Sequence, residues 1–119
     1  MPLRKHLSRA LTALALAGTA LSAQAEVVKT EVNGLTVRGN LERAADTSMA
    51  EGVVLLVHGT KGHYGMGLIQ QIQDGLTEKG YNTLAINLSL GINDRTGFQP
   101  CDVVQRHRHE DAIPQIEAW

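Results

Sequence analysis

Cysteine is scarce in this chain, because Cys101 is the only one among 119 residues. A single thiol cannot close a disulfide within the chain, so the sequence excludes a small fold held together by internal disulfides. Two interpretations of Cys101 remain. Its thiol pairs with a cysteine outside these residues, or the side chain is a small, half-buried apolar group without chemistry, which is what we expect.

The chain also has no basic stripe with interleaved aromatic residues. Aromatic residues make up 3% of the sequence, and the whole chain has a formal net charge of −1. Without its first 25 residues, eight basic and twelve acidic residues give a charge of −4. A mildly acidic surface repels phosphates, so nucleic acid is not an expected partner.

Long hydrophobic runs are limited to one apolar stretch, from Ala10 to Leu21. It is shorter than the roughly 20 residues that a membrane-spanning helix needs. The basic residues Arg4, Lys5 and Arg9 stand before or at its start. This order of a charged start and an apolar run is typical of a secretory signal peptide.

The segment Ser22-Ala23-Gln24-Ala25 then offers the small residues that signal peptidase accepts. We therefore expect residues 1–25 to be a signal peptide that is cleaved after Ala25. The mature protein, residues 26–119, would be periplasmic or secreted and would not be attached to a membrane. An uncleaved membrane anchor is the alternative interpretation.

The first part of the mature chain predicts two strands. Apolar and polar residues alternate from residue 27 to 32 and again from 35 to 41. Asn33-Gly34 stands between them and readily adopts the positive φ angles of a two-residue turn. The pattern predicts an antiparallel hairpin, followed by a polar loop over residues 43–52.

A buried strand is predicted at Val53 to Val57, which is continuously apolar. Such a run is typical of a central strand that helices cover on both faces. After a glycine-rich turn, four apolar residues recur at helical spacing and predict an amphipathic helix that ends at Lys79, with Gly80 as its C′ residue. These residues are Leu68, Ile69, Ile72 and Leu76.

Residues 81–88 predict a further buried strand, parallel to the strand at 53–57 and joined to it by a right-handed crossover. A long polar loop follows over residues 89–102. The last helix carries Ala112, Ile113, Ile116 and Trp119, and we expect it to start near Glu110 or Asp111 so that Pro114 falls in its first turn. The predicted fold class is α/β, with an antiparallel front edge.

Two phosphate-binding glycine motifs fail at necessary positions. Gly62 and Gly67 have P-loop spacing, but Leu68 and Ile69 stand where Lys and Ser or Thr are needed. Gln70 occupies the place of the third glycine in a dinucleotide motif. The sequence therefore predicts no nucleotide cofactor, and indeed no cofactor of any kind.

One cluster, His107, His109, Glu110 and Asp111, contains residue types that bind metals. Two histidines two positions apart point to opposite sides of a helix, so only an irregular segment could bring them to one ion. Arg106 also lies beside them. We expect a solvated helix start here and no metal site.

The order of these elements, with the string Val57-His58-Gly59-Thr60-Lys61-Gly62, resembles the first part of the α/β-hydrolase superfamily. The resemblance implies that the backbone amide of Thr60, with Lys61 as its neighbour, supplies half of an oxyanion hole. It also implies that His58 braces the turn rather than acting as a base, while Gly59 and Gly62 permit close approach. A glycine-rich connection in another α/β fold is the alternative.

No catalytic residue can be assigned within these 119 residues. A nucleophile in this superfamily lies in a G-x-S-x-G elbow, and the sequence has none. Ser89 lacks the preceding glycine, and Ser48 is a loop serine. Asp94, Asp102 and His109 have no motif that gives them a catalytic role.

We therefore interpret the chain as the N-terminal portion of an exported hydrolase that, by resemblance, acts on small ester or acyl substrates. Residues 26–119 would be an incomplete domain without turnover of its own. An exported binding protein without chemistry, or a pseudogene product of the same fold, is the alternative from another class. A metal-dependent protein using His107 and His109 is a third, and the sequence leaves the oligomeric state open.

Overall fold

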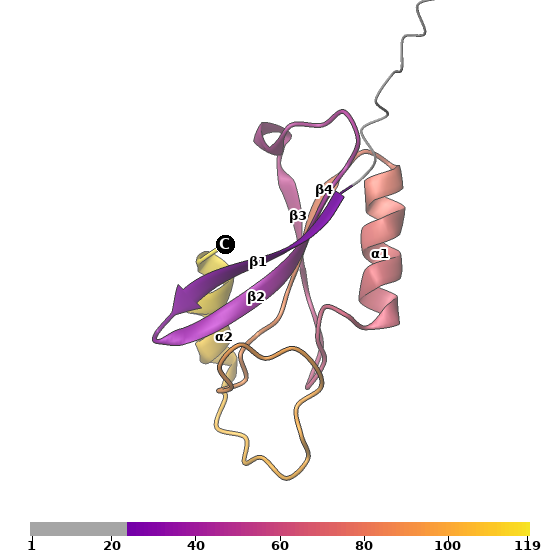
Figure 1. Ribbon diagram of the computed structural model, residues 1–119. Helices are drawn as coiled ribbons and strands as arrows, with labels where there is room; N and C mark the ends of the chain where they lie inside the picture. Colours follow the sequence, from indigo (N-terminus) through magenta and orange to yellow (C-terminus); the bar gives the residue numbers. More distant parts are fainter. Residues whose placement is uncertain (1–23) are drawn as a thin grey trace, which may run out of the picture.

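The computed structural model describes residues 24–119 as one open mixed sheet with two helices (Figure 1). Among these residues the strand order is β1-β2-β4-β3. The elements, in chain order, are β1 (Gln24–Val32), β2 (Leu35–Arg43), the short 3-10 helix η1 (Met49–Glu51), β3 (Val53–Val57), α1 (Gly67–Glu78), β4 (Asn82–Ile86) and α2 (His109–Glu117).

The predicted hairpin is confirmed. β1 and β2 pair antiparallel, and Val32 faces Leu35 across the turn. Both turn residues have positive φ, 50° at Asn33 and 79° at Gly34. Positive φ at both central positions is the geometry of a type I′ turn, whose twist matches that of the two strands.

The predicted parallel pair is also confirmed. β3 and β4 run parallel, with Leu55 opposite Leu84, and the other side of β4 pairs antiparallel with β2. All five residues of β4 are buried because this strand has a neighbour on each side. The strand is shorter than predicted, since it begins at Asn82 and ends at Ile86.

The expectation that β3 is a central strand is wrong for the residues that the structure describes. β3 lies at the outer end of the sheet order, and Val53 and Val57 are 38% and 40% exposed. A continuously apolar run indicates a strand in apolar surroundings, but it does not determine whether that strand lies at the centre or at the edge of the sheet. The central position belongs to β4.

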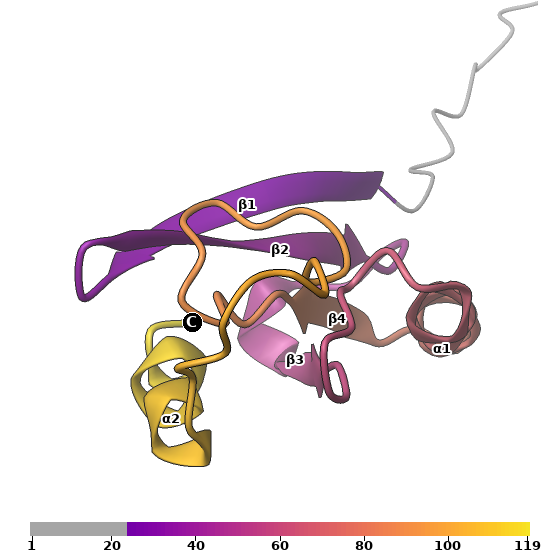
Figure 2. The same ribbon diagram turned by 90° about the horizontal axis from the view of Figure 1, so that it is seen from below.

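The two helices lie on opposite sides of the sheet (Figure 2). α1 packs against β4 and β2. On the other face, Ala112 and Ile116 of α2, together with Trp119 just after it, pack against a buried apolar cluster. The cluster consists of Leu41, Leu84, Ile86, Leu88 and Leu90. This face holds the apolar core that positions the chain after β4.

The face that α1 turns to the sheet differs from the predicted apolar stripe. Gln73 and Thr77 are its buried residues, whereas Leu68 is 65% and Ile72 is 39% exposed. Gln73 donates to the backbone carbonyl of Asn40 and to the hydroxyl of Thr83, both at 3.0 Å. The sheet presents polar groups here, and buried polar groups require hydrogen-bond partners.

The helix ends are only partly as expected. Gly80 follows α1 with a φ of 88°, which confirms its place as the C′ residue. α2 begins at His109, before the expected start, so Pro114 lies inside the helix. Its ring nitrogen has no hydrogen to donate to the Glu110 carbonyl, and packing of Ile116 and Trp119 on the core offsets that lost bond.

The expected signal peptide lies almost entirely outside the described residues. Only Gln24 and Ala25 are described, as the exposed start of β1, where they pair with Arg43 and Glu42. Within residues 24–119, no helix is long and apolar enough to span a membrane.

Candidate functional site

The segments that follow β3 and β4 meet at one edge of the sheet. Because the two strands are parallel, their carboxyl ends lie at the same edge. The turn after β3 and the long loop between β4 and α2 therefore come together there (Figure 1). In open α/β sheets, ligands bind outside the carboxyl ends of the strands.

The turn after β3 has a defined geometry. The Gly62 amide donates to the Gly59 carbonyl at 3.0 Å, and between them only Lys61 has a positive φ, of 57°. These features describe a type II turn, in which Thr60 and Lys61 are the central residues. In the part of the chain that the structure describes, neither the Thr60 amide nor the Lys61 amide donates a hydrogen bond to a backbone carbonyl.

Lys61 is a side-chain-bearing residue at a position that favours glycine. The left-handed region costs an L-residue roughly 1–2 kcal/mol. Strain of this kind persists where the surroundings hold the backbone, and it is found most often at functional sites. Gly62 next to it could not carry a Cβ without moving its neighbours, since that atom would lie 2.7 Å from the Met66 Sδ.

His58 is buried below this turn, with 7% of its surface exposed. Its Nδ1 lies 2.7 Å from the Gly59 carbonyl oxygen, and the backbone amide of Leu88 donates to its Nε2 at 3.0 Å. Nδ1 is therefore the protonated nitrogen of a neutral ring. Burial lowers the pKa of His58, and nearby Arg95 lowers it further. Neither ring nitrogen is free to take a proton from a substrate.

Arg95 completes the bracing of His58, and sequence reasoning missed it. The guanidinium is buried and donates to the Leu88 carbonyl at 2.9 Å, to the Gly97 carbonyl, and to the His58 Nε2 at 3.0 Å. Burial lowers its pKa. A single arginine in a loop rich in glycine and asparagine gives no periodic signal, so the pattern alone suggests an exposed side chain.

Asn87 ties the two segments together and was also missed. Its carboxamide oxygen accepts from the Tyr64 amide at 2.6 Å, and its nitrogen donates to the Arg95 carbonyl at 2.9 Å. Its own backbone amide donates to the Arg38 carbonyl at 2.8 Å. The loop after β4 is thus fixed against both the turn after β3 and β2.

A cavity of about 470 Å³ opens at this turn, and we call it the turn cavity. No carboxylate is among the side chains on its wall. The wall consists of His58, Gly59, Thr60, Lys61, Leu88, Leu90, Gln105, His107, Arg108 and His109. The candidate oxyanion residues and the start of α2 therefore share one hollow.

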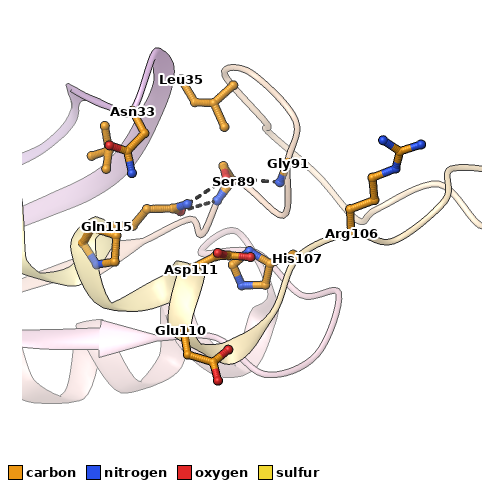
Figure 3. Close-up of a pocket in the computed structure, with 11 residues that line it drawn as sticks. Asn33, Leu35, Ser89, Gly91, Arg106, His107, Glu110, Asp111 and Gln115 are labelled. Carbon is orange, nitrogen blue, oxygen red and sulfur yellow. Dashed lines mark hydrogen bonds between the residues drawn. The ribbon is translucent and has the colours of Figure 1, made fainter.

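Ser89 lies on the wall of a second, smaller cavity of about 280 Å³ (Figure 3). It is 2% exposed, and its backbone amide donates to the Gln115 Oε1 at 2.7 Å. Its hydroxyl oxygen accepts from the Gln115 Nε2 at 2.9 Å and from the Gly91 amide at 3.2 Å. These bonds dock α2 on the loop, which is a structural role.

The remaining serine and acidic residues singled out in the sequence lie apart from the turn cavity. Asp94 binds the Arg38 Nε at 2.8 Å and the Lys29 Nζ at 3.1 Å, and these partners lower its pKa. Ser48 accepts from the Ala50 amide and caps η1. Asp102 is exposed, and so is Cys101, so the expectation of a half-buried thiol is wrong.

The cluster around the start of α2 is a helix cap. The Asp111 carboxylate accepts from the backbone amide of Arg108 at 2.7 Å. His107 lines both cavities, while His109 and Glu110 are exposed. In residues 24–119, no group of three or more His, Cys, Asp or Glu side chains is placed to hold a metal ion.

Comparison with known proteins gives a similarity to a solved esterase structure. No family model and no curated protein matches the chain. A solved structure of a cold-adapted esterase from an Arctic intertidal metagenomic library, bound to PEG, is 32% identical with a TM-score of 0.50. The match covers 67% of this chain and 35% of the esterase chain, so the chain spans about a third of that protein's length. The matched part has a hydrolase-like fold.

Proposed function

We propose that residues 26–119 form the N-terminal part of an α/β-hydrolase domain that acts on small ester or acyl compounds. The sheet order and the similarity to an esterase support the fold. The observation that carries the function is the type II turn whose two central residues, Thr60 and Lys61, line the turn cavity. A pair of adjacent backbone donors at the end of a strand is suited to a developing oxyanion.

In this function, the amides of Thr60 and Lys61 donate to the oxygen that becomes negative as the acyl carbon is attacked. His58 and Arg95 keep the turn rigid, so the donors need little reorganisation during the reaction. The 119 residues contain no G-x-S-x-G sequence. We therefore assign them the oxyanion donors and not the nucleophile, and a serine-directed inhibitor that abolished esterase activity of this chain would contradict that assignment.

The Thr60→Pro variant tests the oxyanion assignment. Proline suits the first central position of a type II turn, so the variant removes one amide hydrogen while keeping the turn. We expect it to weaken binding of phenylphosphonate, a tetrahedral anion, by about tenfold, because a hydrogen bond to a charged group is lost. An NMR titration of the 119-residue chain measures this affinity and shows whether the Lys61 amide resonance shifts.

Thr60→Val is the matched control, since it removes the hydroxyl and keeps the amide. It should bind phenylphosphonate as the parent does. Equal affinity of Thr60→Pro and the parent would reject the oxyanion assignment. A binding protein without chemistry would then be the better interpretation.

We also propose that the chain is exported and cleaved after Ala25. Cleavage there removes only two exposed residues of β1 and keeps the ion pair between the Glu26 carboxylate and the Arg43 guanidinium, at 3.3 Å. We expect the mature product to begin at Glu26. Mass spectrometry of the exported protein measures its N-terminus, and a product that keeps residues 1–25 would contradict cleavage.

A further inference from the structure

The wall of the turn cavity is positively charged. Two of its residues, Lys61 and Arg108, have permanently cationic side chains, and the wall also includes three histidines and no Asp or Glu. This lining is a local feature, because residues 26–119 carry more acidic than basic side chains. The acidic residues nearest to Arg108 along the chain, Glu110 and Asp111, line the smaller cavity that Ser89 also lines.

These two cations have no ionic partner in the part of the chain that the structure describes. Its three ion pairs involve Lys29, Arg38 and Arg43, and none includes Lys61 or Arg108. Asp111 binds the backbone amide of Arg108. Cations without a counter-charge on a concave wall raise the local concentration of anions.

Lys61 also links this charge to the oxyanion turn. Its amide is one of the two candidate donors, and Lys61 is also one of the two cationic residues that line the cavity. A ligand that uses both groups must carry an oxygen acceptor and an anionic group only a few bonds apart. Arg108, at the start of α2, lines the same cavity and adds a second contact for the anion.

We infer that the ester bound at this turn carries a carboxylate close to its ester carbonyl. The inference rests on the proposed function, because it adds a charge requirement to the ester that the turn would polarise. The carboxylate meets Lys61 and Arg108 while the ester carbonyl meets the amides of Thr60 and Lys61. A neutral ester of the same size would lack the first interaction.

Two matched esters test this inference on the 119-residue chain. Monomethyl succinate carries one carboxylate beside its ester, and dimethyl succinate is neutral. At low ionic strength we expect the monoanion to bind about tenfold more tightly, measured by NMR titration. High salt should reduce this preference, because solvent-exposed charges are screened. Equal affinity for the two esters would overturn the inference.

Three variants locate the interaction. Lys61→Gly removes the ammonium but keeps the amide and suits the positive φ, and Arg108→Gln removes the guanidinium. Each should lower the preference for the monoanion over dimethyl succinate about threefold or more. Arg106→Gln, which removes the same charge from the same segment but outside the turn cavity, should keep the preference. If Arg106→Gln lowers the preference for the monoanion as much as the other two variants do, the inference is overturned, because the preference then comes from the overall positive charge of the segment.

The two proposals fail in different ways. If the Lys61 and Arg108 variants lose the preference while Thr60→Pro binds phenylphosphonate normally, the cavity recognises anions without an oxyanion turn. If Thr60→Pro weakens phenylphosphonate binding while both esters bind alike, the oxyanion assignment stands and the charge requirement is rejected.

Discussion

Replacing Arg95 with methionine is expected to lower the free energy of unfolding by about 3 kcal/mol. Methionine keeps most of the apolar stem but has no donor for the carbonyl oxygens of Leu88 and Gly97, which the guanidinium bonds in the parent. Leu88 is buried and Gly97 is half-buried, and a buried carbonyl group that loses its partner costs the penalty of leaving water. Urea denaturation followed by circular dichroism measures the change, and an unchanged m-value would confirm that the unfolded state is comparable.

Arg106→Met is the control, because Arg106 is exposed and lies in the same loop. It should change the free energy of unfolding by no more than about 0.5 kcal/mol. Equal stability of the parent and Arg95→Met would show that the buried guanidinium does not hold the loop.

The pKa of His58 gives a second readout of the same substitution. Burial lowers this pKa most, and the positive charge of Arg95 contributes. In the parent, the unfolded state therefore binds more protons than the folded state as the pH falls below the ordinary histidine value of 6.5. Stability is fully present above that value and decreases below it. Arg95→Met should raise the pKa of His58 and weaken this pH dependence.

The sequence predicts those parts of the fold that depend on local patterns. Alternation around Asn33-Gly34 is enough to predict the β1-β2 hairpin, since the turn and both strands are adjacent in the chain. The apolar run at 53–57, a helix and a second apolar run are enough to predict the parallel β3-β4 pair. Glycine at position 80 likewise identifies the end of α1, because a positive φ is needed there.

The polar residues that hold the candidate site together could not be predicted in this way. Asn87 bonds Tyr64, and Arg95 bonds His58, so the partners are 23 and 37 positions apart. A polar side chain in a loop has the same sequence signature whether it is exposed or buried with such a partner. In the sequence, only the resemblance predicted the oxyanion role of Thr60 and Lys61, and that role stays a prediction, which the Thr60→Pro variant tests.

The polar interface under α1 shows the same limit within a regular element. Hydrophobic periodicity predicts a helix but assumes that its apolar stripe faces the sheet. Gln73 is instead fully buried. Its side-chain oxygen accepts from the Asn40 carboxamide, and its side-chain nitrogen donates to the Asn40 carbonyl and to the Thr83 hydroxyl. Only the polar groups of the opposing strands make this arrangement favourable, and they lie far from α1 in the sequence.

Gln73→Leu is therefore expected to lower the free energy of unfolding by about 2–3 kcal/mol, although leucine is apolar and similar in size. The loss arises because the half-buried carbonyl of Asn40 and the buried hydroxyl of Thr83 both lose the Gln73 donor. Urea denaturation measures it. Gln71→Leu on the exposed side of the same helix is the control and should change stability by no more than about 0.5 kcal/mol.

A second substitution separates unpaired polar groups from poor packing. Thr83→Val removes the buried hydroxyl, so in combination with Gln73→Leu it should cost less than the sum of the two single variants. A double-mutant cycle with an interaction energy of about 1 kcal/mol would show that the Gln73 and Thr83 side chains stabilise each other. Strict additivity would mean that the helix is held by its apolar contacts instead, and that the buried glutamine contributes through its volume alone.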